Sequence, residues 1–239
     1  MTTYATLQTL INNRTSFAIQ KQYFYDKEAV SVVYAANSFK IPYKVINNYK
    51  DFFKISNAIP VGNVNWISAI LKDMNIDIKP DYYPTYLKPL ITRKIWHTNE
   101  WPKQSGIFIK PADTYKRFTG FVTMGGYKKK KRGPYVCSEI ISIENEWRLY
   151  VSGGKIISCQ WYDGNDENAI LTDALYYIEG LLPSTCYGAL DVATLKISNR
   201  IELIEFQHPF ACGWYGNIND YSYTRWLVNG WKSLTNYKE

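Results

Sequence analysis

Apolar and polar positions alternate with a period of two through much of the second half of the chain, which is the pattern of half-buried strands. In the clearest stretch, 106–111, Ile107 and Ile109 point to one face of a strand, and Phe108 and Lys110 point to the other. The final proline of this stretch should end the strand because it has no N–H to donate. The same alternation predicts strands at 118–124, 134–143, 146–152, 154–162, 187–195 and 200–207.

The first 80 residues alternate between short apolar runs and helical patterns. Apolar runs at 16–20 and 41–46 predict strands, a helix that Asp26 can cap lies between them, and 59–62 is typical of a turn. Asn63 can then cap an amphipathic helix. The apolar stripe of that helix comprises Trp66, Ile67, Ile70, Leu71 and Met74. This alternation predicts a small N-terminal α/β lobe with a layered sheet.

A connector and two helices complete the predicted organisation. Four prolines interrupt residues 77–104, and the aromatic residues of this segment need burial, so we expect it to pack between lobes. A helical stripe runs from Ile170 to Ile178, with Gly180 suited to the position just past its end. A last helix begins near Asp220. The pattern predicts an α+β protein with an N-terminal lobe over residues 1–90 and a second domain over residues 91–239.

Length and composition are those of a globular protein and argue against disorder of the whole chain. The 239 residues are 46% hydrophobic and 21% charged, and 16% are aromatic. The formal net charge of +7 suits a phosphate-rich partner such as a nucleotide or nucleic acid. About five of these charges come from one run, Lys128 to Arg132, so the remainder of the chain is only mildly basic.

Four widely spaced cysteines and two histidines, without a C-x-x-C pair, argue against a zinc site. This spacing, and a start without a basic region or apolar run, predict reduced thiols in a cytoplasmic compartment. No stretch reaches the ~18 apolar residues of a membrane span, so no membrane partner is expected. The Lys-, Asn- and Tyr-rich composition is typical of a phage or an AT-rich bacterium, and a viral protein would act in the host cytoplasm.

Charged residues within apolar strands are the candidate chemistry. Lys110 could hold a phosphate, with an attraction of roughly 4 kcal/mol at about 4 Å and an effective dielectric near 20. The alternative is a solvent-exposed lysine on an edge strand. Asp191 and Glu205 are mid-strand carboxylates, which are costly to bury unless they are paired or bind a metal. With Lys110 and Arg148 they could form a Mg²⁺–triphosphate site. The alternative is a structural ion network.

Eight short motifs follow one another over about residues 59 to 207, more than half of the chain. They are Ile59–Val64, Tyr83–Pro84 with Arg93–Trp96, Phe108–Pro111, Lys116–Gly120, Ser138–Glu139, Glu146–Arg148, Asp191–Val192 and Glu205–Gln207. In this order the chain resembles an ATP-grasp protein. Within that superfamily it is most similar to a divergent clade named for two arginines and a lysine, which is related to a eukaryotic chaperone of translation-initiation complex assembly.

The resemblance implies an ATP-grasp fold, in which ATP lies between two α+β subdomains. Family members use ATP to phosphorylate a carboxylate, and an amine then attacks the acyl phosphate. ATP and Mg²⁺ are therefore the implied cofactors, and an amino acid, peptide or protein is the implied acceptor. Positive charge and metal at the transferring phosphoryl group carry this chemistry, so no covalent side chain is required.

The resemblance also implies a nucleotide-binding set. Lys110 would contact the α- or β-phosphate, and Lys116 would be a second phosphate or substrate contact. Glu139 would lie at the hinge that holds adenine and ribose. Arg148 would steady the γ-phosphate or the acyl phosphate.

The implied metal ligands lie on two strands. Asp191 and Glu205 would bind Mg²⁺, joined by Gln207, which stands where family enzymes usually carry Asn. By alternation, Glu205 and Gln207 would share a face with Ile201 and Leu203. Arg93 matches an upstream family arginine and would act towards the acceptor. The catalytic candidates are Arg148, Lys116 and Arg93.

Three functions are open from the sequence. The leading hypothesis is an ATP-dependent carboxylate–amine ligase, and the second is a non-catalytic ATP-binding assembly factor. The least favoured is a nucleic-acid-binding protein organised around Lys128–Arg132, a run that could instead be a solvated loop or a lid over the triphosphate. His208 is the one base beside the predicted site, and a structural role is favoured for it.

Overall fold

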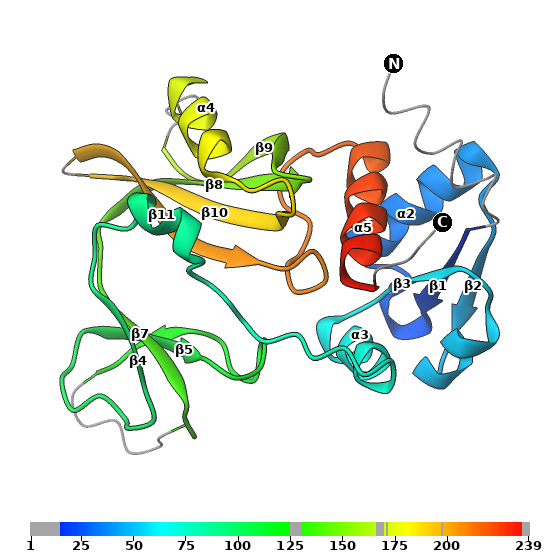
Figure 1. The fold of residues 1–239 in the computed structure, drawn as a ribbon, viewed down its shortest axis with the longest axis horizontal. Helices are drawn as coiled ribbons and strands as arrows, with labels where there is room; N and C mark the ends of the chain where they lie inside the picture. The colour runs from blue at the N-terminus through cyan, green and yellow to red at the C-terminus, as the bar shows by residue number, and fades with distance from the viewer. Residues whose placement is uncertain (1–14, 125–130, 166–169, 171, 197, 236–239) are drawn as a thin grey trace.

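The computed structural model describes residues 15–124, 131–165, 170, 172–196 and 198–235. It contains a parallel sheet near the N-terminus and two antiparallel sheets after it (Figure 1). Helices cover the parallel sheet and one face of the larger antiparallel sheet. The predicted α+β class is therefore confirmed.

The N-terminal lobe is a three-stranded parallel sheet of order β2-β1-β3 with two helices. Its elements are β1 (Ser16–Gln20), η1 (Lys21–Tyr23), α2 (Lys27–Phe39), β2 (Tyr43–Ile46), η2 (Tyr49–Lys54), β3 (Ala58–Val61) and α3 (Val64–Asp73). The Asn63 side chain caps α3 by accepting from the backbone N–H of Trp66 at 3.0 Å, as predicted. The predicted turn at 59–62 is wrong, because most of it is β3. Pro60 is tolerated there because β3 is an edge strand.

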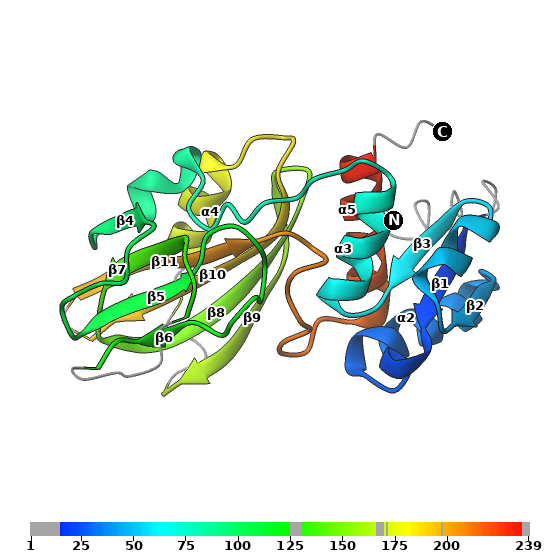
Figure 2. The ribbon, with the colours of Figure 1, turned by 90° about the horizontal axis from the view of Figure 1, so that it is seen from below.

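Two four-stranded antiparallel sheets follow; they lie one above the other in Figure 1 and overlap when seen from below in Figure 2. The small sheet has the order β4-β7-β5-β6, and the large sheet has the order β11-β10-β8-β9. The small sheet comprises β4 (Ile95–Thr98), β5 (Ile107–Pro111), β6 (Phe121–Val122) and β7 (Tyr135–Glu139). The large sheet comprises β8 (Ile143–Ser152), β9 (Lys155–Gly164), β10 (Tyr187–Leu195) and β11 (Ser198–Gln207). Alternation missed β4, which lies inside the predicted connector, and Pro111 is still paired as the last residue of β5.

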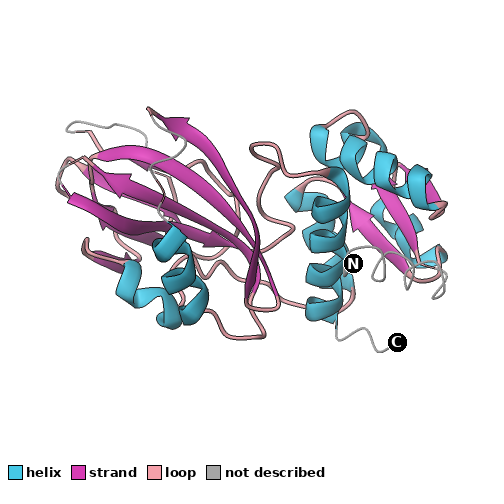
Figure 3. Cartoon of the chain, turned by 90° about the horizontal axis from the view of Figure 1, so that it is seen from above, coloured by secondary structure: helices cyan, strands magenta, loops and turns pink. Residues whose placement is uncertain are grey.

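The large sheet is apolar on one face and polar on the other. Trp147, Leu149 and Leu190 point to the apolar face and are fully buried or nearly so. Helix α4 (Thr172–Leu181) and the 3₁₀ helix η3 (Thr85–Leu90) cover this face (Figure 3). Gly180 was expected just past the helix, but it lies within the last turn of α4. The opposite, polar face of the sheet is directed towards the small sheet.

The last described helix, α5 (Asp220–Thr235), packs against α2 and the N-terminal lobe. Trp226 and Trp231 are 0% and 2% exposed, in one cluster with Phe17 and Phe52. The predicted helix beginning at Asp220 is confirmed. The division into residues 1–90 and 91–239 stays a prediction. Helix α5 belongs by sequence to the second of these ranges but packs on the first.

Three of the residues in the basic run, 128–130, lie outside the described part of the chain. Lys131 and Arg132 are exposed, and their backbone carbonyls accept from the Tyr135 hydroxyl and the Arg117 guanidinium. All four cysteine thiols are free. Among the helices that the structure describes, none has the length and apolar character needed to cross a bilayer.

Candidate active site

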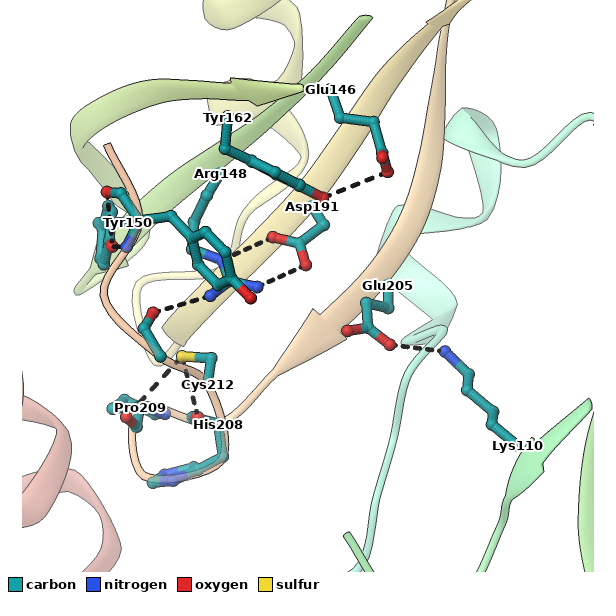
Figure 4. A network of polar contacts seen from close by, with 12 residues as sticks. Lys110, Glu146, Arg148, Tyr150, Tyr162, Asp191, Glu205, His208, Pro209 and Cys212 are labelled. Carbon is teal, nitrogen blue, oxygen red and sulfur yellow. Dashed lines mark hydrogen bonds and ion pairs between the residues drawn. The ribbon is translucent and has the colours of Figure 1, made fainter. Parts of the chain in front are cut away.

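Strand register places three of the predicted residues side by side on the polar face of the large sheet. Asp191 on β10 is paired with Arg148 on β8 and with Glu205 on β11. Directly opposed residues of antiparallel strands have their side chains on the same face, within about 5.5 Å at Cβ. The row Glu205–Asp191–Arg148 therefore faces the small sheet, from which Lys110 projects towards it (Figure 4).

Arg148 and Asp191 form a buried two-point ion pair. Arg148 Nε donates to Asp191 Oδ1 at 2.7 Å, and Nη2 donates to Oδ2 at 2.6 Å. The two side chains are 4% and 6% exposed. Burial lowers the pKa of the Arg148 guanidinium and the Asp191 charge raises it, so that the resulting pKa lies above the ordinary value of an arginine. The arginine is therefore permanently charged, and its third group, Nη1, donates to the Gly213 carbonyl at 2.8 Å.

Lys110 crosses from the small sheet to the large one. Its Nζ lies 2.9 Å from Glu205 Oε2, and the lysine is only 5% exposed, so the alternative of a solvent-exposed edge lysine is wrong. The rings of Tyr82 and Tyr83 flank the ammonium, with centroids 3.7 and 4.7 Å away. Lys110 is therefore held as a fixed charge by one carboxylate and two aromatic faces.

Asp191 and Glu205 offer carboxylate oxygens that could hold a divalent cation. Each carboxylate oxygen that accepts from a cationic side chain keeps a second lone pair, so both carboxylates have lone pairs left to bind a cation. Within the described ranges, no group of three or more His, Cys, Asp or Glu side chains could hold a metal ion. A Mg²⁺ ion on these two carboxylates would need further oxygens from a ligand such as a polyphosphate, which is its usual preference.

A β-bulge corrects the predicted face of β11. Alternation placed Leu203 on the face of Glu205, but the register shifts between them, and Leu203 is fully buried on the apolar face. Gln207 pairs with Ala189, one row from Glu205. Gln207 lies on the same strand face as Glu205, and its role as a metal ligand stays a prediction.

Glu139 and Lys116 lie at the edges of this network. Glu139 ends β7 and is exposed, and its Oε2 accepts from the backbone N–H of Lys94 at 2.9 Å. Lys116 is exposed on the loop after β5, with a φ of 54°. Its charge lowers the pKa of the Cys212 thiol and so opposes the larger effect of burial. The roles of both residues stay predictions.

Arg93 is buried against β11 instead of facing open space. Its guanidinium lies 2.5 Å from Glu202 Oε1 and also donates to the Leu203 carbonyl at 2.7 Å. Arg93 is 9% exposed and Glu202 is 0% exposed. The acceptor role expected of Arg93 stays a prediction.

Glu146 and Tyr162 extend the polar face, and the sequence indicated no role for either residue. The Tyr162 hydroxyl donates to Glu146 Oε1 at 3.2 Å, two residues along β8 from Arg148. Burial raises the pKa of Glu146, the Tyr162 hydroxyl lowers it, and the charges of Asp191 and Glu205 raise it further. The alternation of β8 already places Glu146 and Arg148 on one face, and this signal could have found Glu146.

The loop from His208 to Asn217 packs over the same face. The Tyr150 hydroxyl accepts from the Tyr215 backbone N–H at 2.9 Å, and the Tyr215 ring lies 4.3 Å from the Arg148 guanidinium. Burial lowers the pKa of His208 to about 3 and raises the pKa of Cys212 to about 12. At neutral pH these residues are a neutral imidazole and a protonated thiol, so neither is a charged acid or a thiolate nucleophile. The structural role favoured for His208 agrees with its neutral state.

A cavity of about 530 Å³ lies beside this network and not within it. It separates α3 from the loop after β5, with Lys72 and Asn75 on one side and Asp113 and Thr114 on the other. Tyr115 lines the cavity and contacts Tyr82 edge-to-face at 5.8 Å. The Tyr115 and Tyr82 rings therefore separate the cavity from the Lys110 ammonium.

Several solved structures are similar to this chain, and one with a TM-score of 0.50 is an ATP-grasp ligase. The ATP-grasp ligase PsnB complexed with a minimal precursor aligns over 91% of this chain and 99% of its own, with 11% identity and a TM-score of 0.50. The macrocyclase MdnC from Microcystis aeruginosa MRC, bound to precursor peptide MdnA, aligns over 90% and 100% with 11% identity and a TM-score of 0.49. N5-carboxyaminoimidazole ribonucleotide synthetase from Thermotoga maritima aligns over 90% and 76% with 10% identity and a TM-score of 0.46.

The sequence itself places the chain more narrowly than these structures do. The comparison with curated proteins gives no match. The model of an ATP-grasp domain, family 2 of the clade named for two arginines and a lysine, matches residues 86–225, from η3 into α5. This match confirms the resemblance seen in the order of the motifs. Because it spans more than half of the chain, the protein belongs to family 2 of that clade of ATP-grasp domains.

Proposed function

We propose that this protein is an ATP-dependent carboxylate–amine ligase that works through an acyl phosphate and modifies an amino acid, peptide or protein acceptor. The observation that carries the proposal is the row Glu205–Asp191–Arg148 on the large sheet, which faces Lys110 on the small sheet. Two cations and two carboxylates in one buried network match what phosphoryl transfer requires of a protein, namely positioning and charge stabilisation.

The residues present fit Mg²⁺ and ATP. Asp191 and Glu205 would hold the metal ion, and Lys110 and Arg148 would face the phosphates, with Lys116 as a further contact. When bound, ATP and its metal ion supply the phosphoryl group that activates the carboxylate and part of the charge that stabilises its transfer. Glu139 would lie towards the nucleoside, where a carboxylate can accept hydrogen bonds from ribose hydroxyls.

The chain's own groups would then position charge. Lys110 is now paired with Glu205, and this pair has to open for the ammonium to reach a phosphate oxygen. Arg148 is fixed by three hydrogen bonds to Asp191 and Gly213, so its charge is pre-organised for a developing negative charge and needs little reorganisation. The neutral His208 and protonated Cys212 agree with a mechanism without a covalent protein intermediate.

A peptide or protein is the acceptor class that we favour. The PsnB structure was solved with a minimal precursor, and we extend that substrate class to this chain as part of the proposal. The cavity of about 530 Å³ between α3 and the loop after β5 has room for a side chain or a short peptide segment. It adjoins the loop that carries Lys116.

Nucleotide binding and turnover test the proposal separately. Thermal unfolding is measured with ATP, with ATP and Mg²⁺, and with RNA. ATP with Mg²⁺ at about 100 times its dissociation constant should add about 2.7 kcal/mol of stability. ADP and phosphate release with a peptide library then tests ligation. Asp191→Ala and Glu205→Ala should abolish release, and Lys155→Ala, on an exposed pair with Glu179, is the control.

The remaining outcomes of these assays each favour a different function or assignment. Stabilisation by ATP and Mg²⁺ without turnover on any acceptor would favour the non-catalytic assembly factor. Stabilisation by RNA alone, lost with rising salt, would favour nucleic-acid binding. Full activity of both carboxylate variants would refute the metal assignment.

A further inference from the structure

A β-bulge lies beside the proposed metal site. Asp191 on β10 pairs with Glu205, whereas Val192 pairs with Leu203, so Ile204 is an extra residue on β11. The register therefore brings Glu205 onto the polar face at the point where it meets Asp191. Bulged residues leave backbone groups outside the ladder, and buried backbone groups need other partners.

Arg93 supplies partners for this bulge. Its Nη1 donates to the Leu203 carbonyl at 2.7 Å and lies 2.5 Å from Glu202 Oε1, while Nη2 donates to the Ile204 carbonyl at 3.2 Å. Nη2 also donates to the Tyr83 hydroxyl at 3.2 Å. One planar guanidinium thus holds two successive carbonyls and a carboxylate of β11, which a lysine cannot do with the same geometry.

The partner carboxylate is itself fully held. Glu202 is 0% exposed, and its second oxygen accepts from the backbone N–H and the hydroxyl of Thr92. Arg93 lies under the Tyr83 ring, with its Cζ 5.4 Å from the centroid, and the same ring flanks Lys110 at 4.7 Å. Arg93 therefore contacts, directly or through Tyr83, the elements that carry Glu205 and Lys110.

We infer that Arg93 is a positioning residue, which fixes the bulge of β11 and thereby sets the Glu205 carboxylate beside Asp191. This inference rests on the proposed function. It differs from the role towards the acceptor implied by the family resemblance, because the guanidinium is buried and its hydrogen bonds go to protein groups. A ligand carboxylate has to be held within about 0.5 Å of its productive position, so loosening the bulge should weaken metal binding first.

A Mg²⁺ titration separates positioning from bulk stability. Binding of a fluorescent ATP analogue is followed at fixed analogue concentration as Mg²⁺ rises, and again in EDTA. Arg93→Lys keeps the charge and loses the planar fork, and Glu202→Gln keeps the shape and loses the charge. Arg200→Lys, an exposed arginine on the same strand, is the matched control.

Arg93→Lys should raise the Mg²⁺ midpoint by about 10-fold or more, the usual effect of removing a partner that orients a ligand. Binding of the analogue in EDTA and the midpoint of the control should change less than about twofold. Glu202→Gln should act like Arg93→Lys, and the double variant should be little worse than either, because the two residues act as one unit. If Arg93→Lys does not fold, Tyr83→Phe removes one acceptor and should raise the midpoint less.

The outcomes are distinguishable. Arg93→Lys and Tyr83→Phe that unfold at lower temperature but keep the wild-type Mg²⁺ midpoint would overturn the positioning role and leave the proposed function intact. Equal weakening of binding in EDTA and in Mg²⁺ would assign Arg93 to the nucleotide and also overturn it. A wild-type protein that binds the analogue without any dependence on Mg²⁺ would overturn the proposed function, and this inference with it.

Discussion

Removing the charge of Asp191 tests whether the Arg148–Asp191 pair is needed for ligand binding or only for stability. Asp191→Asn keeps the side-chain shape but leaves the Arg148 guanidinium buried at 4% exposure without a counter-charge. Breaking one partner of a buried pair costs about 3–5 kcal/mol. For a chain of this length, each kcal/mol corresponds to about 2–4 °C, so the melting temperature should fall by about 6–20 °C.

A double variant then separates the two roles. Asp191→Leu with Arg148→Met replaces both charges by apolar groups, which is often neutral for a buried pair. It also loses the hydrogen bond to the Gly213 carbonyl, so a residual cost of about 1 kcal/mol is expected. Stability should therefore recover most of the way. Stabilisation by ATP and Mg²⁺ should stay absent in both variants.

Thermal unfolding with and without ATP and Mg²⁺ is the assay, with the wild type and the exposed-pair variant Lys155→Ala as references. The wild type should gain about 5–11 °C at saturating ligand, the equivalent of about 2.7 kcal/mol. A double variant that is restored in stability and still gains this shift would refute the reasoning, since the pair would then be structural alone. A loss below about 1 kcal/mol in Asp191→Asn would refute the burial argument.

Three further predictions concern stability and reactivity. Burial lowers the pKa of His208 from 6.5 to about 3, so the folded protein keeps the imidazole neutral and loses stability as the pH falls below 6.5. In denaturant titrations between pH 6.5 and 5, His208→Gln should therefore lose less stability than the wild type, by up to about 2 kcal/mol. Gly216 has a φ of +70° and an added Cβ would lie 2.5 Å from Gln160, so Gly216→Ala should destabilise the protein by about 1–3 kcal/mol. Gly180 has open space around it, so Gly180→Ala should stabilise the protein by about 0.5–1 kcal/mol. Equal changes in the free energy of unfolding for the two variants would contradict this difference. The Cys137 thiol, 0% exposed and with a pKa raised to about 11 by burial, should react with a thiol reagent only on unfolding, and prompt modification of Cys137 itself in the native protein at neutral pH would show that it is accessible.

Local rules predicted the elements whose burial follows a simple period. The alternation at 107–110 located β5 and the side of Lys110, and the alternation of β8 separated Arg148 from Trp147 and Leu149. The Asn63 cap was predictable because its hydrogen bond lies within one turn of α3. These features depend on neighbours a few residues away.

Features that depend on distant contacts were not predictable. The bulge at Ile204 shifts Glu205 relative to Leu203, and strict alternation cannot reveal one inserted residue. Pro60 suggested a turn, but an edge position in a parallel sheet accommodates it in β3. The burial of Arg93 follows from Glu202, more than a hundred residues later in the sequence, which no local pattern indicates.

The packing of α5 has a consequence for how the chain folds during synthesis. The N-terminal lobe leaves the ribosome first, yet Phe17 and Phe52 share their core with Trp226 and Trp231 of the last described helix. Without that helix, the apolar surface around β1 and α2 stays open to water. The lobe that is made first is therefore completed last, and a nascent chain stalled before residue 220 should expose this surface to chaperones and proteases.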